Sequence, residues 1–320
     1  MAPELRVDPL SGLRTIIAPD RALRPIAPPP GEVPPRNEDD PFAPGNEAQT
    51  PPELFALRDA AGDWRVRVFA NRYPALADDV VGGQRDAQPE LFTKLPARGS
   101  HEVIINSPRA VSALAELSVD ELGEAVDVWR ARMRVHADAA AIHVTVNEGS
   151  EAGRSIPHTH AQLFALDFVP ALIARERERA AAYAARTLGH SLLGDLIAEE
   201  VRRGERIVAI DDEAVLLAPF ASMLPYQLML APRRPRLHFE DEGPSGCTLL
   251  HDGLQRLAGL FGGSPPLNLW VRTAPRGADH FCWRIDVVPR LTGLAGLELG
   301  SGVHLNTVAP EQAAAALRGA

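Results

Sequence analysis

Two histidines one residue apart, His158 and His160, are the side chains of this sequence best placed to do chemistry, and Gln162 follows at the same spacing. Side chains two apart on a strand point to the same face, so all three are expected to line one surface. Residues 149–153 are rich in glycine and polar residues and predict a loop over that surface. An imidazole nucleophile, an amide donor and a loop would suit attack on a phosphorus atom. A His-x-His pair by itself, however, is more often a metal site or two polar residues on a strand.

The elements that must position these side chains alternate between strand and helix patterns. Strands are expected at 142–146 and 156–166, after a helix at 119–140 whose apolar residues share one face, namely Leu122, Val126, Trp129 and Met133. Proline-rich residues 26–52 predict an extended loop. Further strands are predicted at 64–70, 102–106, 206–211, 214–218, 227–231, 267–272 and 283–288, and further helices at 169–203, with a break near Gly189, and at 251–261. The second half repeats the order of the first, and the pattern alone predicts mixed α and β structure.

Composition narrows the class of protein. A net charge of −9 argues against a nucleic-acid backbone as the main partner, and 45% apolar residues are enough for a core. No apolar run reaches the ~18 residues of a membrane span, and the charged, proline-containing start lacks a signal-peptide core. Two cysteines, Cys247 and Cys282, imply no disulfide framework. We therefore expect a cytoplasmic protein with no membrane partner.

Residues 147–162, N-E-G-S-E-A-G-R-S-I-P-H-T-H-A-Q, resemble the active-site strand of galactose-1-phosphate uridylyltransferases, a family of the histidine-triad superfamily. The family signature N-x-G…G-x-S-x-P-H-x-H-x-Q is matched here by Asn147, Gly149, Gly153, Ser155, Pro157, His158, His160 and Gln162. Further family blocks match in order at 6–25, where a strand leads into an R-x-x-R-P turn, and at 41–47, 68–76, 99–109, 217–234 and 287–306. The resemblance covers nearly the whole chain.

The resemblance implies an α+β fold, a duplicated histidine-triad-like fold in which two halves, each with an antiparallel sheet and packed helices, flank a shared sheet. We expect the first half at 1–170, with the His-x-His-x-Gln strand, and the second at 171–320. In the second half, Cys282-Trp283-Arg284 stands where the first half has His158-Thr159-His160. Relatives form dimers, so a homodimer is expected.

The resemblance also assigns His160 as the nucleophile that becomes uridylylated, with its other ring nitrogen held by backbone beside His158. Neutral imidazole, with an ordinary pKa near 6.5, does not repel a phosphate, and a covalent intermediate splits the transfer into two displacements. Histidine-triad hydrolases carry a third histidine at the position of Gln162. Because an amide does not titrate, Gln162 favours transfer to a second phosphate over hydrolysis.

Several further residues are expected to contact substrate. Asn147, Ser155 and the backbone of Gly153 and Arg154 are candidate donors to phosphate. The Arg154 side chain adds a cation that is unusual for this loop, unless it is a solvated loop residue.

More distant candidates come from the resemblance alone. It assigns Arg21 and Arg24 of the R-x-x-R-P turn to the sugar phosphate or nucleotide, although a basic surface turn is the alternative. It assigns Asn71 to the nucleotide and Glu298 to the hexose hydroxyls. His304 and Asn306, which lie near Glu298 in the sequence, are weaker candidates.

The metal ligands of the family are missing, so the chain is identified as a divergent member. The family tetrapeptide C-P-F-C is D-P-F-A at 40–43, a histidine ligand is Ala110, and of the four zinc ligands only His158 remains. We therefore expect no zinc and no other cofactor. A salt bridge from Asp40 to a cation such as Arg109 is hypothesised in its place.

The second metal site of the family lacks its ligands too. The family's H-W-H is C-W-R at 282–284, and a further histidine position is Pro235. We expect Cys282 to pack as a small apolar residue, and Arg284 to form a salt bridge with a nearby carboxylate or to bind an anion.

Three functions remain open. The main interpretation is a nucleotidyltransferase of galactose metabolism that moves UMP between a UDP-hexose and a hexose 1-phosphate. A second keeps the histidine chemistry but uses phosphate as the acceptor, as an ADP-sugar phosphorylase. A third is a catalytically silent paralogue that binds a nucleotide sugar. All three share nucleotide sugars and sugar phosphates as partners.

Overall fold

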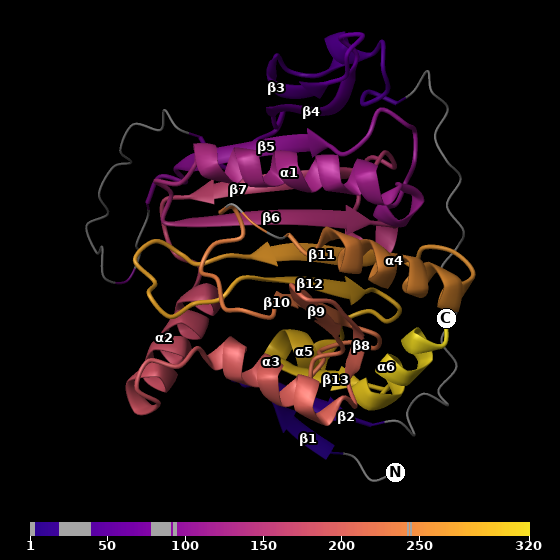
Figure 1. Ribbon diagram of the computed structural model, residues 1–320. Helices are drawn as coiled ribbons and strands as arrows, with labels where there is room; N and C mark the ends of the chain where they lie inside the picture. Colours follow the sequence, from indigo (N-terminus) through magenta and orange to yellow (C-terminus); the bar gives the residue numbers. More distant parts are fainter. Residues whose placement is uncertain (1–3, 19–39, 78–90, 92–94, 242, 244) are drawn as a thin grey trace.

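A computed structural model describes residues 4–18, 40–77, 91, 95–241, 243 and 245–320. Within these residues, ten strands form one antiparallel sheet in the order β3-β4-β5-β7-β6-β11-β12-β10-β9-β8 (Figure 1). Their bounds in that order are Glu53–Arg58, Trp64–Ala70, Gly99–Ile105, His160–Leu166, Ala141–Glu148, Leu267–Arg272, Arg284–Pro289, Leu228–Pro232, Ala214–Leu217 and Ile207–Ile210. A smaller sheet holds β1 (Glu4–Val7), β2 (Arg14–Ile17) and β13 (Val303–Asn306). The helices are α1 (Val119–Val135), α2 (Ala171–Arg186), α3 (Leu192–Arg203), α4 (Cys247–Phe261), α5 (Gly296–Ser301) and α6 (Pro310–Arg318).

The large sheet contains the same arrangement twice. In chain order, β3-β4-β5-α1-β6-β7 is followed by β8-β9-β10-α4-β11-β12. Both sets place their strands in the same spatial order, and β6 pairs with β11 at the centre of the shared sheet. The predicted α+β fold with a shared antiparallel sheet is confirmed. The division of the chain at residue 170, just before α2, stays a prediction.

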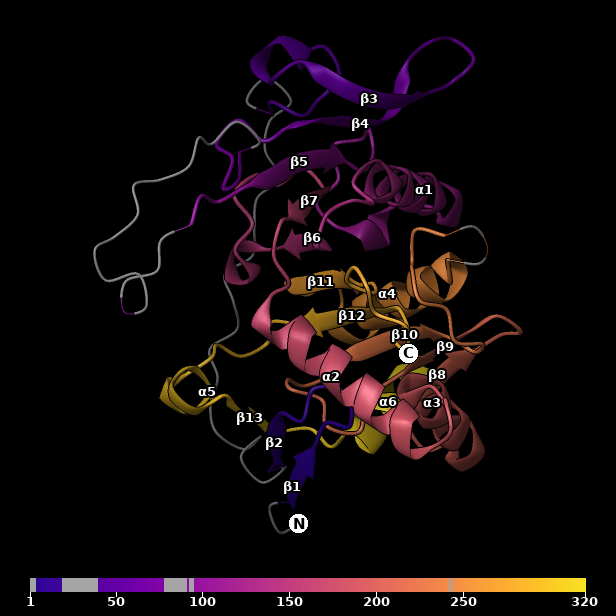
Figure 2. The same ribbon diagram turned by 90° about the vertical axis from the view of Figure 1, so that its left-hand side faces the viewer.

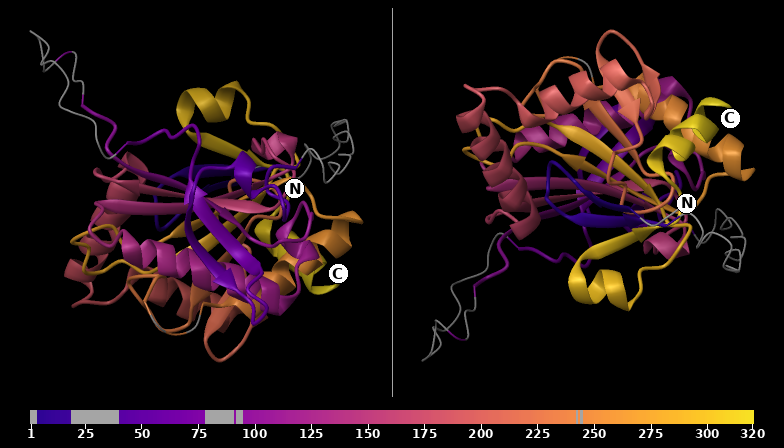
Figure 3. Two further views of the ribbon diagram at one scale, coloured as in Figure 1. Left: turned by 90° about the horizontal axis from the view of Figure 1, so that it is seen from above. Right: turned by 90° about the horizontal axis from the view of Figure 1, so that it is seen from below.

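Helices α1, α4 and α6 build the main core on one face of the sheet. The predicted apolar face of α1 is buried there, with Leu122, Val126, Trp129 and Met133 inaccessible to solvent. Ser118 begins α1 with a capping box, since its side chain accepts from the Glu121 amide while the Glu121 carboxylate accepts from the Ser118 amide. Figure 2 shows α1 and α4 on one side of the strands and α5 and β13 on the other, and Figure 3 shows the layering from above and below.

The opposite face of the sheet is covered unevenly. Beneath the second half, α3 packs through Leu193 and Ile197 against apolar side chains of β9 and β10. On β6 and β7 the same face carries polar, half-buried side chains, including Thr145, Asn147 and Gln162. This polar surface is where the predicted nucleophile lies.

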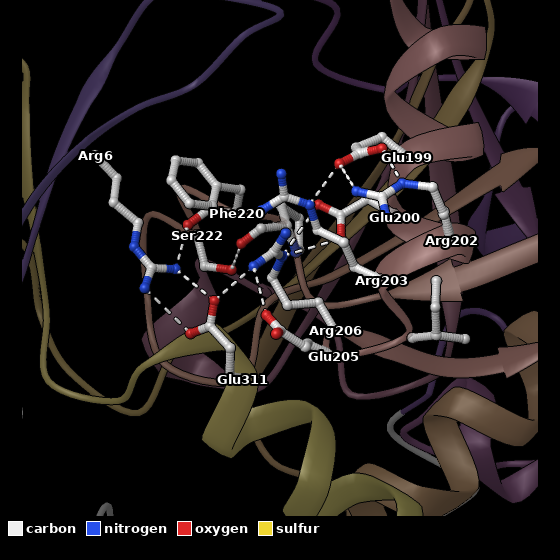
Figure 4. A network of polar contacts seen from close by, with 12 residues as sticks. Arg6, Glu199, Glu200, Arg202, Arg203, Glu205, Arg206, Phe220, Ser222 and Glu311 are labelled. Carbon is white, nitrogen blue, oxygen red and sulfur yellow. Dashed lines mark hydrogen bonds and ion pairs between the residues drawn. The ribbon is translucent and has the colours of Figure 1, made fainter.

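Ion pairs tie the two ends of the described chain together (Figure 4). Glu311 on α6 accepts from Arg6 on β1 at 2.9 Å and from Arg206 at 2.6 Å. Arg206 also pairs with Glu200 on α3, and both of these side chains are buried. Each arginine therefore has a carboxylate partner, which buried charges require.

Some element boundaries differ from the predictions. The 119–140 helix ends at Val135, and the strand predicted from 156 begins at His160, so His158 precedes it. The 169–203 helix is broken as predicted, with Gly189 at a positive φ of 95° between α2 and α3. The strand predicted before the R-x-x-R-P turn is β2, whereas β1, β3, β13, α5 and α6 were not predicted. No helix among the described residues is long and apolar enough to cross a membrane.

Candidate active site

His160 is held as a neutral imidazole at the start of β7. Its Nδ1 lies 2.8 Å from the backbone oxygen of His158, so Nδ1 carries the proton and Nε2 keeps its lone pair. Burial lowers the pKa of His160, and the positive charges of His158 and Arg154 lower it further, against the opposing effect of the His158 carbonyl. The ring of Phe42 meets the imidazole edge-on at 5.2 Å. The geometry leaves Nε2 of His160 unprotonated near neutral pH, as the predicted role of nucleophile requires.

His158 is fixed by two oxygen acceptors in the interior. Its Nδ1 lies 2.7 Å from Asp40 Oδ2 and its Nε2 lies 2.7 Å from the Ser107 carbonyl. Both side chains of the His158–Asp40 pair are completely buried. The other Asp40 oxygen accepts from the Phe42 amide at 2.9 Å. The buried pair is therefore fixed at both ends by hydrogen bonds to the backbone.

Asp40 is buried and paired, as hypothesised, but its partner is His158 and not Arg109. Asp40 pairs with His158, whereas Arg109 donates to Glu121 at 2.8 Å near the start of α1. Arg109 is half exposed and already satisfied by this nearby carboxylate, while Asp40 is buried. A buried carboxylate needs a partner inside, and His158 supplies it.

The residues at the position where the resemblance places a zinc site do not fit a metal. Asp40, Ala110 and His158 line a cavity of about 40 Å³, and His158 already uses both ring nitrogens. Within the described residues, no three His, Cys, Asp or Glu side chains are grouped to hold a metal ion. No chemical step is derived through a metal, and the absence of zinc stays a prediction.

Gln162 lies on the same face of β7 as His160, and its amide is bonded to a residue that the sequence did not single out. His101 on β5 approaches Gln162 Oε1 with its Nε2 at 2.9 Å. The Asn71 amide nitrogen lies 3.1 Å from the same ring nitrogen. Asn71, the predicted nucleotide contact, and Gln162 thus both lie beside the same ring nitrogen of His101.

Asn147 and the loop after it are anchored by the second half of the chain. Asn268 on β11 donates to Asn147 Oδ1 at 2.7 Å and to the Ala152 carbonyl at 2.8 Å. Gly149 begins the loop with a φ of 82°, and a Cβ there would lie 2.6 Å from Pro266. Only glycine fits this combination of positive φ and close approach.

The other predicted loop residues lie in this segment. A short 3-10 helix, Ser150–Ala152, ends at Gly153, and both Gly153 and Ser155 are exposed. Arg154 is half-buried, and its Nη1 donates to the carbonyls of Ser112 at 2.9 Å and Pro157 at 3.3 Å. Arg154 is therefore an anchored cation close to His160 rather than a solvated loop residue.

Of the remaining candidates, those that the structure describes are not brought to His160. Arg21 and Arg24 lie outside the described residues. Glu298 accepts from the Ala295 amide and caps α5, which lies beside β13 at the other end of the molecule from β7 (Figure 1). Asn306 is buried and donates to the carbonyls of Ser222 and Leu224, while His304 is half-buried on β13. Substrate contacts by these residues stay predictions.

In the second half, Arg284 forms the salt bridge that was expected as one alternative. It donates to both oxygens of Glu176 at 3.0 Å and to Asp286 at 3.0 Å, all three being buried. The two carboxylates raise the pKa of Arg284, although burial opposes them. Cys282 packs with apolar side chains beside α3, as expected. The position equivalent to His160 thus holds a structural ion pair.

Comparison with known proteins gives consistent matches. A model of the galactose-1-phosphate uridyl transferase N-terminal domain matches residues 1–170. The chain is 29% identical to an ADP-glucose phosphorylase of Arabidopsis thaliana over 334 residues, which cover 99% of this chain and 93% of the relative. It is 28% identical to a galactose-1-phosphate uridylyltransferase of Cryptococcus neoformans over 345 residues, covering 98% and 89%.

Solved structures show the same architecture. The crystal structure of an ADP-glucose phosphorylase from Arabidopsis thaliana with bound ADP-glucose has a TM-score of 0.83 and 27% identity, with 100% of this chain and 99% of that chain covered. A uridylyltransferase structure has a TM-score of 0.76 at 22% identity, with 99% and 97% covered, and supports the fold alone.

Proposed function

The chain belongs to the galactose-1-phosphate uridyl transferase family, and from this premise we propose that His160 carries a nucleoside monophosphate between a nucleotide sugar and a phosphate acceptor. The observation that carries the proposal is the hydrogen bond from His160 Nδ1 to the His158 carbonyl, at 2.8 Å. It fixes the proton on Nδ1 and leaves Nε2 as the nucleophile.

The reaction proceeds in two displacements. In the first, His160 Nε2 attacks the α-phosphorus of the nucleotide sugar, an N–P bond forms, and the P–O bond to the sugar phosphate breaks. The ring then carries a positive charge, which the His158 carbonyl stabilises through Nδ1–H. In the second, an oxygen of the acceptor phosphate attacks the same phosphorus and the N–P bond breaks. The free imidazole is restored, so one nucleophile serves both steps.

Donors around His160 match the charge that develops on the phosphate. Gln162 and Asn147 offer amide N–H groups on the same face of the sheet, and Arg154 places a cation near the nucleophile. A sugar phosphate leaves as a stable anion, so it needs no proton from the protein. An amide at position 162 is therefore sufficient, and the geometry favours transfer over hydrolysis.

Two substrate pairs are candidates. The first is a UDP-hexose with a hexose 1-phosphate, the reaction of galactose metabolism, in which UMP is carried. The second is ADP-glucose with inorganic phosphate, which the full-length similarity to the Arabidopsis ADP-glucose phosphorylase favours.

Initial-rate kinetics test the proposal and separate the pairs. UDP-glucose with galactose 1-phosphate is compared with ADP-glucose and phosphate, with each substrate varied at several fixed levels of the other. Parallel double-reciprocal lines with one pair support a covalent intermediate and identify the substrates. Intersecting lines would contradict it. No turnover, combined with nucleotide-sugar binding by calorimetry, would favour the silent paralogue.

We further propose a cytoplasmic homodimer. Both cysteines are free thiols, which is compatible with a reducing compartment. The dimer is supported by the family resemblance. Sedimentation equilibrium tests it: a mass of one chain across micromolar concentrations would contradict the dimer.

A further inference from the structure

We propose that His101 is a positioning residue that sets the orientation of the Gln162 amide, so that its NH₂ group, and not its oxygen, faces a phosphate on His160. The inference rests on the proposed function and adds a residue to it. An amide has a donor end and an acceptor end of nearly the same shape, and only the donor end binds a phosphate oxygen. Some group must therefore decide which end faces the ligand.

The tautomer of His101 is determined by a backbone group. The Ala75 amide, which can only donate, lies 3.2 Å from His101 Nδ1, so Nδ1 is the acceptor. The proton of the neutral ring is then on Nε2, which lies 2.9 Å from Gln162 Oε1. Burial lowers the pKa of His101, so the ring is neutral near pH 7, against the opposing effect of the Gln162 bond. His101 therefore donates, and Gln162 must present its oxygen to it.

The ring of His101 is itself held in place. It stacks on Phe164 with centroids 4.1 Å apart and planes 24° apart. His101 and Phe164 are direct partners across β5 and β7. The donor is thus built into the sheet rather than carried on a loop, which gives the precision that a catalytic amide needs.

The neighbouring amide of Asn71 follows the same rule. Asn71 Oδ1 accepts from the Tyr73 amide at 2.8 Å, so its NH₂ group is the end beside His101. Because His101 Nε2 carries a proton, the 3.1 Å approach of Asn71 Nδ2 is a contact between two donors. Asn71 therefore does not compete with Gln162 for the Nε2 proton of His101. The Asn71 NH₂ group is available to an acceptor.

Asn147 shows the same arrangement on the other side of the nucleophile. Its oxygen is bonded to Asn268 Nδ2 at 2.7 Å, while Asn268 Oδ1 accepts from Arg290 at 2.8 Å. Arg290 can only donate, so it fixes the orientation of the Asn268 amide. Through Asn268 it also fixes the orientation of the Asn147 amide. The acceptor ends of Gln162, Asn71 and Asn147 are therefore all occupied by protein donors. Only the NH₂ groups of these three amides remain for a ligand. A negatively charged nucleoside diphosphate needs such donors, whereas a neutral ligand does not.

A double-mutant cycle tests the inference. The wild type, His101→Phe, Gln162→Ala and the double variant are compared in single-turnover formation of the nucleotidyl-enzyme from UDP-glucose or ADP-glucose. Phenylalanine keeps the stacking on Phe164 but cannot donate. We expect His101→Phe to lower the rate about tenfold and Gln162→Ala about a hundredfold. If His101 acts through Gln162, adding His101→Phe to Gln162→Ala changes nothing further.

The controls separate positioning from folding. His143→Phe is the matched substitution, since His143 lies on β6 directly across from Phe164, and it is expected to leave the rate within about twofold. Equal effects of His101→Phe in both backgrounds, or no effect in the wild type, would overturn the inference. If the wild type forms no adduct, the proposed function fails, and the same cycle is read from the Kd of the nucleotide sugar by calorimetry. Additive losses there would overturn the role of His101 as well.

Discussion

Removing the Asp40 carboxylate is expected to destabilise the fold strongly, because it is the buried partner of His158. The Asp40 side chain lies 2.7 Å from His158 Nδ1 and accepts from the Phe42 amide at 2.9 Å, and both paired side chains are completely buried. Asp40→Ala leaves a buried ring nitrogen and a backbone amide without partners. Breaking a buried ion pair from one side costs about 3–5 kcal/mol, so we expect a loss of about 4 kcal/mol in the free energy of unfolding.

Asp40→Asn provides the matched comparison. Its oxygen can still accept from the Phe42 amide, and its NH₂ group can donate to Nδ1 of a neutral His158. His158 then keeps its bond to the Ser107 carbonyl through Nε2–H. Only the charge is lost, so the expected cost is about 1–2 kcal/mol.

Urea unfolding followed by far-UV circular dichroism measures both variants. The predicted result is a lower midpoint at an unchanged m-value, with the Asp40→Ala shift at least twice that of Asp40→Asn. A free energy of unfolding of Asp40→Ala within about 0.5 kcal/mol of the wild-type value would refute the reasoning, because the Asp40–His158 pair would then not stabilise the segment before β7.

Three further predictions concern a buried carboxyl group, a buried ion pair and the expected absence of a metal. Burial raises the pKa of Glu148 to about 8, so the folded state retains a proton that the unfolded state releases near 4.5, and stability is lost as pH rises between these values. Glu148→Gln should reduce this pH-dependent fall in the free energy of unfolding by about 3–5 kcal/mol. Equal slopes of the free energy of unfolding against pH in the variant and the wild type would contradict the prediction. Arg284→Met should cost about 3–5 kcal/mol, because Asp286 loses its salt bridge and Glu176 keeps only Arg272, whose Nε lies 3.5 Å away. Adding Glu176→Gln should restore part of the loss; an additive further loss in thermal melts would count against the pair. Chelation with EDTA should change the Tm by less than about 1 °C, and stoichiometric zinc by elemental analysis would contradict the metal-free account.

Buried pairs at the two positions where the metal ligands are predicted to be lost connect these predictions. His158 pairs with Asp40, and Arg284 pairs with Glu176. Each pair is buried and joins segments far apart in the sequence, by 118 and 108 residues. Such pairs are sensitive to loss of one partner and insensitive to chelators, which distinguishes them from metal sites.

Local patterns predicted the elements that bury an apolar face. The residues that define α1 share one face and are all buried, and the break between α2 and α3 falls at a glycine with positive φ. Strand β3 was missed because it is exposed along most of its length and shows no alternation. The end of α1 was placed too late, because the alanines after His136 favour a helix, whereas residues 136–140 form the turn that leads into β6 and bonds the Ala140 amide to the Leu166 carbonyl.

The contacts within the site could be predicted only in part. The pairing of His160 with the backbone of His158 is local, within two residues, and the motif implies it. The partners of Asp40 and Gln162 come from segments 118 and 61 residues away, so they depend on strand register that sequence periodicity does not determine. His101 lies in the block G-S-H-E-V-I-I, which matched the family, but nothing in its own spacing pointed to Gln162.

The central claim is that His160 becomes covalently nucleotidylated, and intact-protein mass spectrometry tests it most directly. The wild type is mixed with UDP-glucose and, separately, with ADP-glucose, beside a His160→Gly control. The account predicts a nucleoside-monophosphate adduct on the wild type with one of the two donors and none on the control, and the mass of the adduct identifies the base. An equal adduct on His160→Gly, or turnover of either donor by the wild type without any adduct at quench times shorter than one turnover, would contradict it.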